Sequence, residues 1–591
     1  MNAVRADVQR YLGGLLLGLF VLAVAGAARA APPIIDYSYR FHPVVGEAGM
    51  VVSQEALASA VGARILERGG NAVDAAVATG FALAVTLPQA GNLGGGGFML
   101  VHLAQGDKTI AIDYRELAPA AAHRDLFVGA DGQVDTELAR FSHRSAGVPG
   151  TVAGLLHAQE RYGTLPLAEV LAPAIALADE GIVVTRALTF SLAEAKPRLS
   201  KSSAAAGYFL LPDGSPPPVG RRWRQADLAT TLRQIAKGGR AAFYEGEIAS
   251  KIVAEMAAHD GLITAQDLAA YRVVEREPVR GTYRGYQIAT MPPPSSGGVH
   301  LVQMLNMLEG WDLAAQGHNS AAYLHRLIES MRRAYADRSR YLGDPDFVSV
   351  PVAELTAKDY AARLRAAIDL ERATPSSAVA LGLEAPAESP QTTHFSVWDR
   401  QGNVVSNTYT LNFSYGSGIA VVGAGFLLNN EMDDFSAQPG APNAYGLLGG
   451  EANAIAPRKR PLSSMTPAIL FRHGKPVLAT GSPGGPVIIT AVLQTVLNVV
   501  DFGMNVAEAS AQPRIHHQWQ PDEVYYEAGI SPDTLKLLQG MGHRMVPSPR
   551  VLGRTQTIAS DGALYYGAND TRWPEGAAVA PCAGCRGLPR R

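Results

Sequence analysis

The chain has 591 residues, of which 47% are hydrophobic and 18% charged, so it can bury a large core and is not intrinsically disordered. Its formal net charge of -2 lacks the basic excess with which nucleic-acid-binding proteins neutralise phosphates. It has only two cysteines, so we expect no framework of several disulfides and no cysteine metal cluster.

The N-terminal region has the pattern of an export signal. Arg5 and Arg10 precede an apolar run over residues 12–26, and an A-x-A motif at 28–30 follows it. The run is shorter than the roughly 20 residues needed to cross a bilayer. We therefore expect residues 1–30 to be removed and the mature protein to be periplasmic or secreted, without a stable membrane anchor. An anchor left uncleaved is the alternative.

The first half of the chain predicts mainly helices. Apolar residues recur at helical spacing over 53–86, with Ser53 and Asn71 as plausible N-caps. Strands are expected at 98–101 and 109–114, and the chain then reads as mostly helical to about residue 370. Four consecutive glycines at 94–97 would suit a phosphate cradle, but they would equally allow two backbones to pack closely.

The second half predicts mainly strands. A loop or linker rich in proline and serine is expected over 371–390. Two alternating segments, 393–398 and 404–410, then read as paired strands, and the chain stays strand-rich to about residue 569 apart from a helix at 490–500. We expect a frayed tail after about residue 570. Its C-x-x-C motif, Cys582 to Cys585, lacks the second pair that would indicate a zinc or redox site.

Thr392 is the residue whose position suggests chemistry, because it lies where the linker meets the first of these strands. A threonine hydroxyl is a weak nucleophile, and the free α-amine of the same residue can activate it. That activation requires the chain to be cut just before Thr392, in a region expected to be exposed. Taken alone, Thr392 and the two residues after it describe only the start of a strand.

Six motifs, in order along the chain, resemble γ-glutamyltranspeptidase, also called glutathione hydrolase, of the bacterial periplasmic type. They are GNLGGGGF at 91–98, DYRE at 113–116, QTTHFSVWD at 391–399, LNNEMDDF at 428–435, KRPLSSM at 459–465 and GSPGG at 481–485. The resemblance implies an α+β fold of the N-terminal-nucleophile hydrolases, which is an αββα four-layer sandwich. It also implies a precursor that cuts itself between Gln391 and Thr392 into a large subunit (31–391) and a small one (392–591), which stay together.

The resemblance further implies roles for single residues. Thr392 would be the nucleophile, Thr410 would hydrogen-bond the Thr392 side chain, and Gly484 and Gly485 would donate backbone N–H groups to the oxyanion. The implied substrate-binding residues are Arg115, Asn412, Glu431, Asp434, Ser463, Ser464 and Tyr445, the last as a lid. A guanidinium suits the substrate α-carboxylate and two acidic residues suit its α-ammonium.

The activity implied is cleavage of γ-glutamyl amides such as glutathione, with transfer of the glutamyl group to water, amino acids or peptides and no metal or organic cofactor. Two alternatives remain: a glutaryl acylase on the same fold, which needs no ammonium site, and a non-catalytic binding protein. His394 is the next candidate for the base if the α-amine is not used. Pro486-Val487 stand where the family pattern suggests Ser-Arg, which leaves acceptor preference open.

Overall fold

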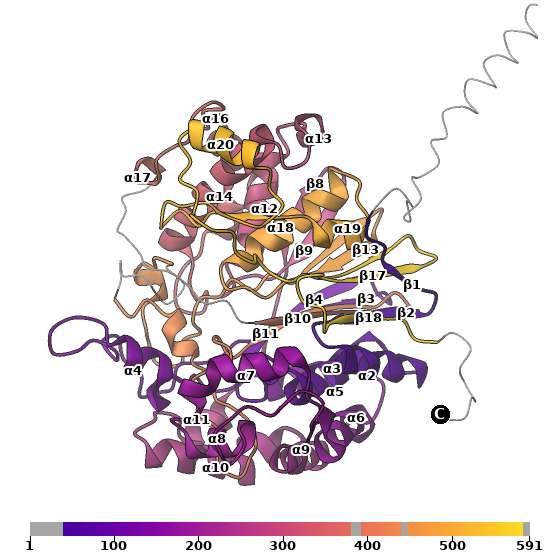
Figure 1. Ribbon diagram of the computed structural model, residues 1–591, viewed down its shortest axis with the longest axis vertical. Helices are drawn as coiled ribbons and strands as arrows, with labels where there is room; N and C mark the ends of the chain where they lie inside the picture. The colour runs from indigo at the N-terminus through magenta and orange to yellow at the C-terminus, as the bar shows by residue number, and fades with distance from the viewer. Residues whose placement is uncertain (1–39, 380–391, 439–442, 444–446, 583–591) are drawn as a thin grey trace, which may run out of the picture.

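Two antiparallel sheets stacked face to face form the centre of the molecule, and helices cover the outer face of each (Figure 1). This computed structural model describes residues 40–379, 392–438, 443 and 447–582. Among them no helix is both long and apolar enough to cross a membrane. The predicted αββα sandwich is confirmed, because each sheet has one face against the other sheet and one face against helices.

The β10 sheet, named after the strand that follows Thr392, holds the candidate nucleophile. Its seven strands lie in the order β18(Ala577–Val579), β2(Gly49–Ser53), β10(Thr393–Asp399), β11(Val404–Thr410), β3(Gly96–Leu103), β4(Lys108–Tyr114), β7(Val274–Arg276). The other sheet, here the β12 sheet, has the order β1(Val44–Gly46), β17(Tyr565–Asn569), β16(Gln556–Ser560), β13(Lys475–Thr480), β12(Ala468–Arg472), β9(Tyr286–Thr290), β8(Val279–Tyr283). Both sheets combine strands from before and after residue 392.

One helical layer packs on the β10 sheet and lies at the bottom of Figure 1. It comprises α2(Ala56–Glu67), α3(Ala72–Thr86), α5(Thr151–Tyr162), α6(Leu167–Glu180), α7(Arg186–Leu199), α8(Ser203–Phe209), α9(Ala226–Tyr244), α10(Glu247–Ala258) and α11(Ala265–Ala270). Asn71 caps α3 in a capping box with Asp74, as predicted. The N-cap of α2 is Glu55, however, because Ser53 is still the last residue of β2.

The opposite layer packs on the β12 sheet and lies at the top of Figure 1. It comprises α12(Gly297–Leu308), α13(Leu313–Gln316), α14(Ala321–Tyr341), α15(Val352–Leu355), α16(Lys358–Ala366), α17(Ser376–Val379), α18(Val487–Val500), α19(Val506–Ala511) and α20(Pro532–Gly540). Short elements join the layers: α4(Thr136–Phe141) and the 3-10 turns η1(His143–Ser145), η2(Glu431–Asp434) and η3(Glu451–Asn453). Two small two-stranded sheets pair β5(Ile182–Val183) with β6(Arg222–Trp223) and β14(Ile515–His516) with β15(Tyr525–Tyr526).

The expectation of a frayed tail after about residue 570 is wrong for the part that the structure describes. Ala577–Val579 form β18, which pairs with β2 at the edge of the β10 sheet. The backbone N–H of Cys582 donates to Glu67, and Cys582 is disulfide-bonded. Residues beyond Cys582, including Cys585, lie outside the described residues. Backbone pairing with an edge strand holds this segment although its small side chains bury little area.

The consecutive glycines at 94–97 allow close backbone packing. A side chain at Gly95 would collide with the carbonyl oxygen of Thr410, and one at Gly97 would collide with that of Thr408. Gly96 and Gly97 lie in β3 directly opposite Thr410 and Tyr409 of β11. The glycines therefore bring β3 tightly against β11, whose last residue is Thr410.

Candidate active site

Thr392 lies immediately before β10, next to the end of β11. Since Thr393 pairs with Tyr409, Thr392 comes opposite Thr410, and its hydroxyl donates to the Thr410 hydroxyl oxygen over 3.3 Å. Thr410 Oγ1 also accepts the backbone N–H of Asn412 at 2.9 Å. Thr392 is only 6% exposed. The two threonine side chains are thus held together in a nearly enclosed position.

The threonines open onto a pocket of about 320 Å³. It is lined by these residues singled out from the sequence: Arg115, Thr392, Thr410, Asn412, Glu431, Asp434, Ser463, Ser464 and Gly485. Gly484 adjoins Gly485 in the chain but does not line the pocket, and Tyr445 lies outside the described residues. Residues from the end of β4, the start of β10, the η2 turn and the loop before β12 therefore meet at one place.

Gly484 and Gly485 form the turn from β13 into α18. Their φ values are 133° and 55°, in the region that residues with a Cβ rarely adopt. Their carbonyl oxygens accept the N–H groups of Val487 and Ile488 in the first turn of α18. The Gly484 carbonyl and the Gly485 N–H belong to one peptide unit, so the helix fixes the direction of that N–H. The Gly484 N–H belongs to the preceding peptide unit, whose Pro483 carbonyl accepts a hydrogen bond from Ser482 Oγ at 2.7 Å. Fixed peptide dipoles are what an oxyanion hole requires.

Arg115 is the centre of a buried charge cluster. Its guanidinium donates short hydrogen bonds to Glu431 and Asp434 of η2, and lies 3.6 Å from the Glu116 carboxylate. The backbone carbonyls of Pro461 and Leu462 accept two further hydrogen bonds from it, at 3.2 and 3.3 Å. Arg115 is 1% exposed. The arginine and the two carboxylates assigned to opposite ends of a substrate are therefore paired with one another in this structure.

Burial shifts the protonation of this cluster. It raises the pKa of Glu116 to about 7, although Arg115 acts in the opposite direction. Burial also raises the pKa of Glu431 well above its usual value, and the neighbouring carboxylates of Glu116 and Asp434 add to that rise. Two glutamates this close in a dry site titrate as a pair. Burial and the neighbouring carboxylates therefore make this pair of glutamates easier to protonate than free glutamates.

Arg338, on α14, lines the same pocket and is not part of any motif found in the sequence. Its guanidinium donates to Ser296 Oγ at 3.0 Å and to Ser464 Oγ at 3.2 Å. No carboxylate oxygen within the described residues lies close enough to it to form an ion pair, with 4.0 Å as the limit. Burial lowers the pKa of Arg338 to about 10, while Asp434 acts against that shift. The pocket thus contains a buried cation without a matching anion.

Two further residues are placed differently from their proposed roles. His394 hydrogen-bonds Thr408 and Ser396 through its two ring nitrogens, at 2.8 and 3.1 Å, and burial lowers its pKa to about 3. It is a weak base and does not line the pocket. Pro486 lines the pocket, whereas Val487 packs away from it with Ala491, Tyr525, Val546 and Leu552. Any effect of this dipeptide on acceptors would therefore come from Pro486.

Sequence reasoning assigned no role to several pocket residues besides Arg338. Leu447, Met465 and Ile488 form an apolar wall together with Pro486, which the sequence had singled out, and Glu116 lies 3.6 Å from Arg115. Met465 and Glu116 adjoin predicted residues, so proximity in the chain was a usable signal. Leu447 and Ile488 have no such signal, because an isolated aliphatic residue in a loop or helix is far more often a core residue.

Comparison with known proteins gives a consistent result. The family model described as Gamma-glutamyltranspeptidase matches residues 58–580. The chain is 53% identical to the glutathione hydrolase proenzyme of Escherichia coli K12 over 557 residues, 92% of this chain and 95% of that one. It resembles a solved cephalosporin acylase from Bacillus halodurans with a TM-score of 0.82, at 30% identity and covering 93% and 98% of the two chains. It also resembles Helicobacter pylori γ-glutamyltranspeptidase, with a TM-score of 0.55 and 46% identity over 56% of this chain and 94% of that one.

Proposed function

The chain belongs to the γ-glutamyltranspeptidase family, and on that premise we propose that it is a γ-glutamyltransferase and glutathione hydrolase. It cleaves γ-glutamyl amide bonds and passes the glutamyl group to water, amino acids or peptides. The observation that carries this proposal is the shared pocket. The pocket contains a threonine hydroxyl, a glycine turn whose N–H groups could bind an oxyanion, and charged side chains of both signs that could bind the ammonium and carboxylate of a glutamyl group.

Maturation begins with a cut between Gln391 and Thr392, giving a large subunit over 31–391 and a small one over 392–591. The Thr392 hydroxyl attacks the carbonyl carbon of Gln391, and water then hydrolyses the ester formed. The reaction frees the α-amine of Thr392, which becomes the base for the catalytic cycle. Such an amine has an ordinary pKa of about 7.7–8.0, close to neutral pH. Export to the periplasm or cell exterior accompanies this maturation, as the pattern over residues 5–30 suggests.

Catalysis then proceeds in two steps. Thr392 Oγ1 attacks the γ-carbonyl carbon while the α-amine takes the hydroxyl proton, and Thr410 orients the attacking oxygen. The backbone N–H groups of Gly484 and Gly485 stabilise the oxyanion. The leaving amine departs with a proton, which leaves a γ-glutamyl ester on Thr392. Water or an acceptor amine attacks the ester and regenerates the free threonine.

Substrate selection follows from the charges in the pocket. Arg115 pairs with Glu431 and Asp434 before substrate binds. When the substrate α-carboxylate takes the Arg115 guanidinium, the α-ammonium of a glutamyl group can pair with the two carboxylates that Arg115 releases. A glutaryl group has no ammonium and would leave these carboxylates unpaired in a buried site, which is costly.

Glutaryl acylase activity is the second candidate, because the chain superimposes on a cephalosporin acylase over nearly its full length. The ratio of kcat/KM for γ-glutamyl and glutaryl p-nitroanilides separates the two. We expect a preference for glutamyl of roughly 30-fold or more, the equivalent of about 2 kcal/mol for an unpaired buried charge. Asp434→Asn should lose most of this preference by slowing the glutamyl reaction. Asp433→Asn is the matched control, since Asp433 pairs with Arg140 instead. Equal rates for the two substrates would favour the acylase.

Self-cleavage is tested on a denaturing gel with N-terminal sequencing. The purified protein should give two fragments, the smaller beginning Thr-Thr-His, and Thr392→Ala should remain uncut. Thr393→Val is the matched control. The hydroxyl of Thr393 has no hydrogen-bond partner among the described residues, and its side chain points to the other face of the strand. An active protein that runs as one unbroken chain would contradict the mechanism.

A further inference from the structure

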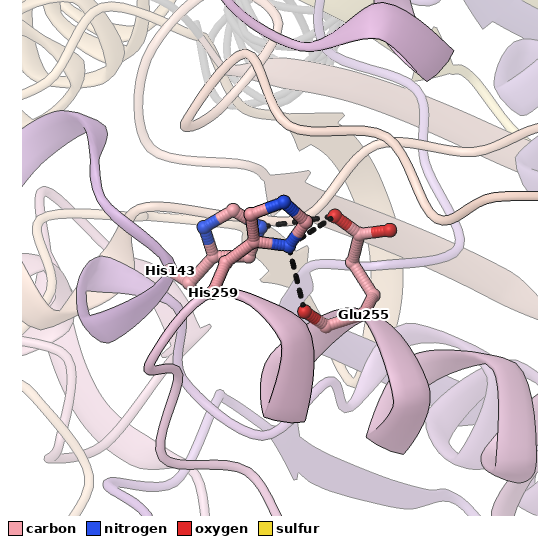
Figure 2. Close-up of side chains that lie close together, drawn as sticks. All are labelled: His143, Glu255 and His259. Carbon is pink, nitrogen blue, oxygen red and sulfur yellow. Dashed lines mark hydrogen bonds and ion pairs between the residues drawn. The ribbon is translucent and has the colours of Figure 1, made fainter.

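Three side chains that the proposed reaction does not use converge at the end of α10. Glu255 lies in the last turn of this helix, His259 directly follows its last residue, and His143 begins η1, more than a hundred residues earlier. Figure 2 shows both imidazole rings with a nitrogen facing the Glu255 carboxylate. The distances from Glu255 Oε1 are 3.0 Å to His143 Nε2 and 3.3 Å to His259 Nδ1.

The spacing of these atoms fits a metal ion. Zinc binds imidazole nitrogen and carboxylate oxygen at about 2.0–2.2 Å in tetrahedral geometry, which places neighbouring ligand atoms about 3.3 Å apart. The two distances from Glu255 Oε1 agree with that spacing, and the three ligand atoms all lie within 4.8 Å of one another. Two histidines and one glutamate form a common three-residue ligand set, with the fourth position open to water.

The charges and exposure at this place also suit a cation. The side chain of Glu255 is 6% exposed, yet no lysine or arginine in the described part of the chain forms an ion pair with it. Its carboxylate is shared by the two histidines only. His259 is 54% exposed, so the cluster has one side open to solvent through which an ion can enter. The rings of His143 and His259 are stacked almost parallel, 4.4 Å apart at their centres, and two protonated rings would repel each other there. A metal ion binds in the plane of each imidazole ring, so one ion can hold both rings only when the exposed His259 ring turns out of the stack.

We propose that His143, Glu255 and His259 form a binding site for a divalent transition-metal ion, for which Zn²⁺ is the natural probe. The mixed nitrogen and oxygen ligands favour zinc and its neighbours over magnesium or calcium, which prefer oxygen alone. Binding displaces the proton on His259 Nδ1, which in this structure also faces the backbone oxygen of Glu255 at 3.1 Å. The metal thus replaces a hydrogen bond within one turn of helix by a bond between α10 and η1.

The position of η1 links this site to the pocket. Just before it, Arg140 pairs with Asp433 at 3.3 Å, and just after it the N–H of Gly147 donates to Asn429 Oδ1 at 2.8 Å. η1 itself packs against η2, which carries Glu431 and Asp434. An ion that joins His143 to α10 would therefore stiffen the segment on which the η2 turn rests. Its first effect is on stability, not on chemistry.

The site is tested by calorimetric titration of the mature protein with Zn²⁺, before and after His259→Ala. His259 is mostly exposed, so this variant should fold normally. We expect the unmodified protein to bind one equivalent of zinc. In His259→Ala the zinc affinity should fall by at least the roughly 10–100-fold that is typical when a partner at a metal site is lost. His157→Ala is the matched control, because His157 forms a similar pair with Glu275 (2.8 Å) but has no second histidine beside it. This control should bind zinc as the unmodified protein does.

A second measurement uses Co²⁺, whose visible absorption is intense when four ligands surround it tetrahedrally. That absorption should appear with the unmodified protein and vanish with His143→Ala, and zinc should raise Tm only where His143 is present. An unchanged zinc affinity in both His259→Ala and His143→Ala would overturn the proposal, as would the absence of any zinc equivalent in the unmodified protein. Either result would leave the cluster as hydrogen-bonded side chains only. Neither readout depends on γ-glutamyl activity, so the proposed function is tested separately.

Discussion

Arg338 offers the sharpest test of how the pocket binds its substrate, because its effects on stability and on activity should have opposite signs. Its guanidinium is buried, and in the described part of the chain it donates only to the hydroxyls of Ser296 and Ser464. No carboxylate in that part of the chain forms an ion pair with it. A substrate α-carboxylate held by Arg115 and the two serines would supply the missing anion. We therefore expect Arg338→Met, which keeps the length of the side chain, to impair substrate binding without unfolding the protein.

The expected magnitudes follow from its surroundings. Burial lowers the pKa of Arg338 from 12.5 to about 10. That shift means the charged form costs the folded protein about 3 kcal/mol at neutral pH. Removing the charge recovers part of this, and the two lost hydrogen bonds oppose it by about 1 kcal/mol each. The net effect on stability is therefore between neutral and slightly favourable. Losing a charged hydrogen bond to substrate costs about 1.5–3 kcal/mol, or roughly 10- to 150-fold in kcat/KM.

The assay is steady-state hydrolysis of a γ-glutamyl anilide, with Tm measured on the same preparations. KM should rise in Arg338→Met while Tm stays level or increases. Arg340→Met is the matched control, since Arg340 lies on the same helix but is exposed over the ring of Tyr341. An unchanged KM, or a loss of activity that merely follows a fall in Tm, would refute the reasoning and make Arg338 a structural residue.

Two other predictions concern the nucleophile and the charge cluster. Thr410→Val keeps the shape of the side chain but removes the acceptor for the Thr392 hydroxyl, so the rates of self-cleavage and of turnover should each fall roughly 2- to 12-fold. Timed gels measure self-cleavage and kcat measures turnover. Unchanged rates would rule out the orienting role of Thr410. Glu116→Gln tests the raised pKa of Glu116. Between pH 4.5, its usual pKa, and about pH 7, the Glu116 carboxyl binds more protons in the folded protein than in the unfolded chain. Glu116 therefore makes the stability of the protein fall as pH rises through this range. The Tm advantage of the variant should therefore grow from pH 5 to pH 8 in calorimetry, and a constant difference would contradict the shift.

The sequence predicted much of the site because its residues lie in short, distinctive segments. The glycine turn at Gly484-Gly485 and the acidic turn with Glu431 and Asp434 are local patterns, and each needs only its own segment to fold as expected. The αββα sandwich was implied by the resemblance to γ-glutamyltranspeptidase, whereas the local patterns alone indicated a helix-rich first half and a strand-rich second half. Motifs within short segments thus identify residues of the site and the helix, strand or turn on which each lies.

Features that depend on distant contacts could not be predicted in this way. Arg338 reads as an ordinary polar residue of α14, and only the packing of that helix over the loop before β12 makes it part of the pocket. His143 and His259 lie more than a hundred residues apart, and neither segment alone resembles a metal motif. β18 is three residues long and has small side chains, so its pairing with β2 carries no recognisable pattern in the sequence. In each of these three examples, the role of a residue or strand depends on a contact with a segment far away in the sequence.

The strand order accounts for why a cut before Thr392 would yield one molecule in two pieces. β10 lies between β2 on one side and β11 on the other, and β11 in turn pairs with β3. The small fragment therefore supplies two central strands of the β10 sheet, with large-fragment strands on both sides. Among the described strands, pulling the fragments apart would break five antiparallel ladders, β2–β10, β2–β18, β3–β11, β1–β17 and β9–β12, and expose both hydrophobic cores. The site itself needs Arg115 from one fragment and Thr392 from the other, so neither fragment could act alone. A cut that frees the nucleophilic amine thus leaves the surrounding sheet, and with it the pocket, in place.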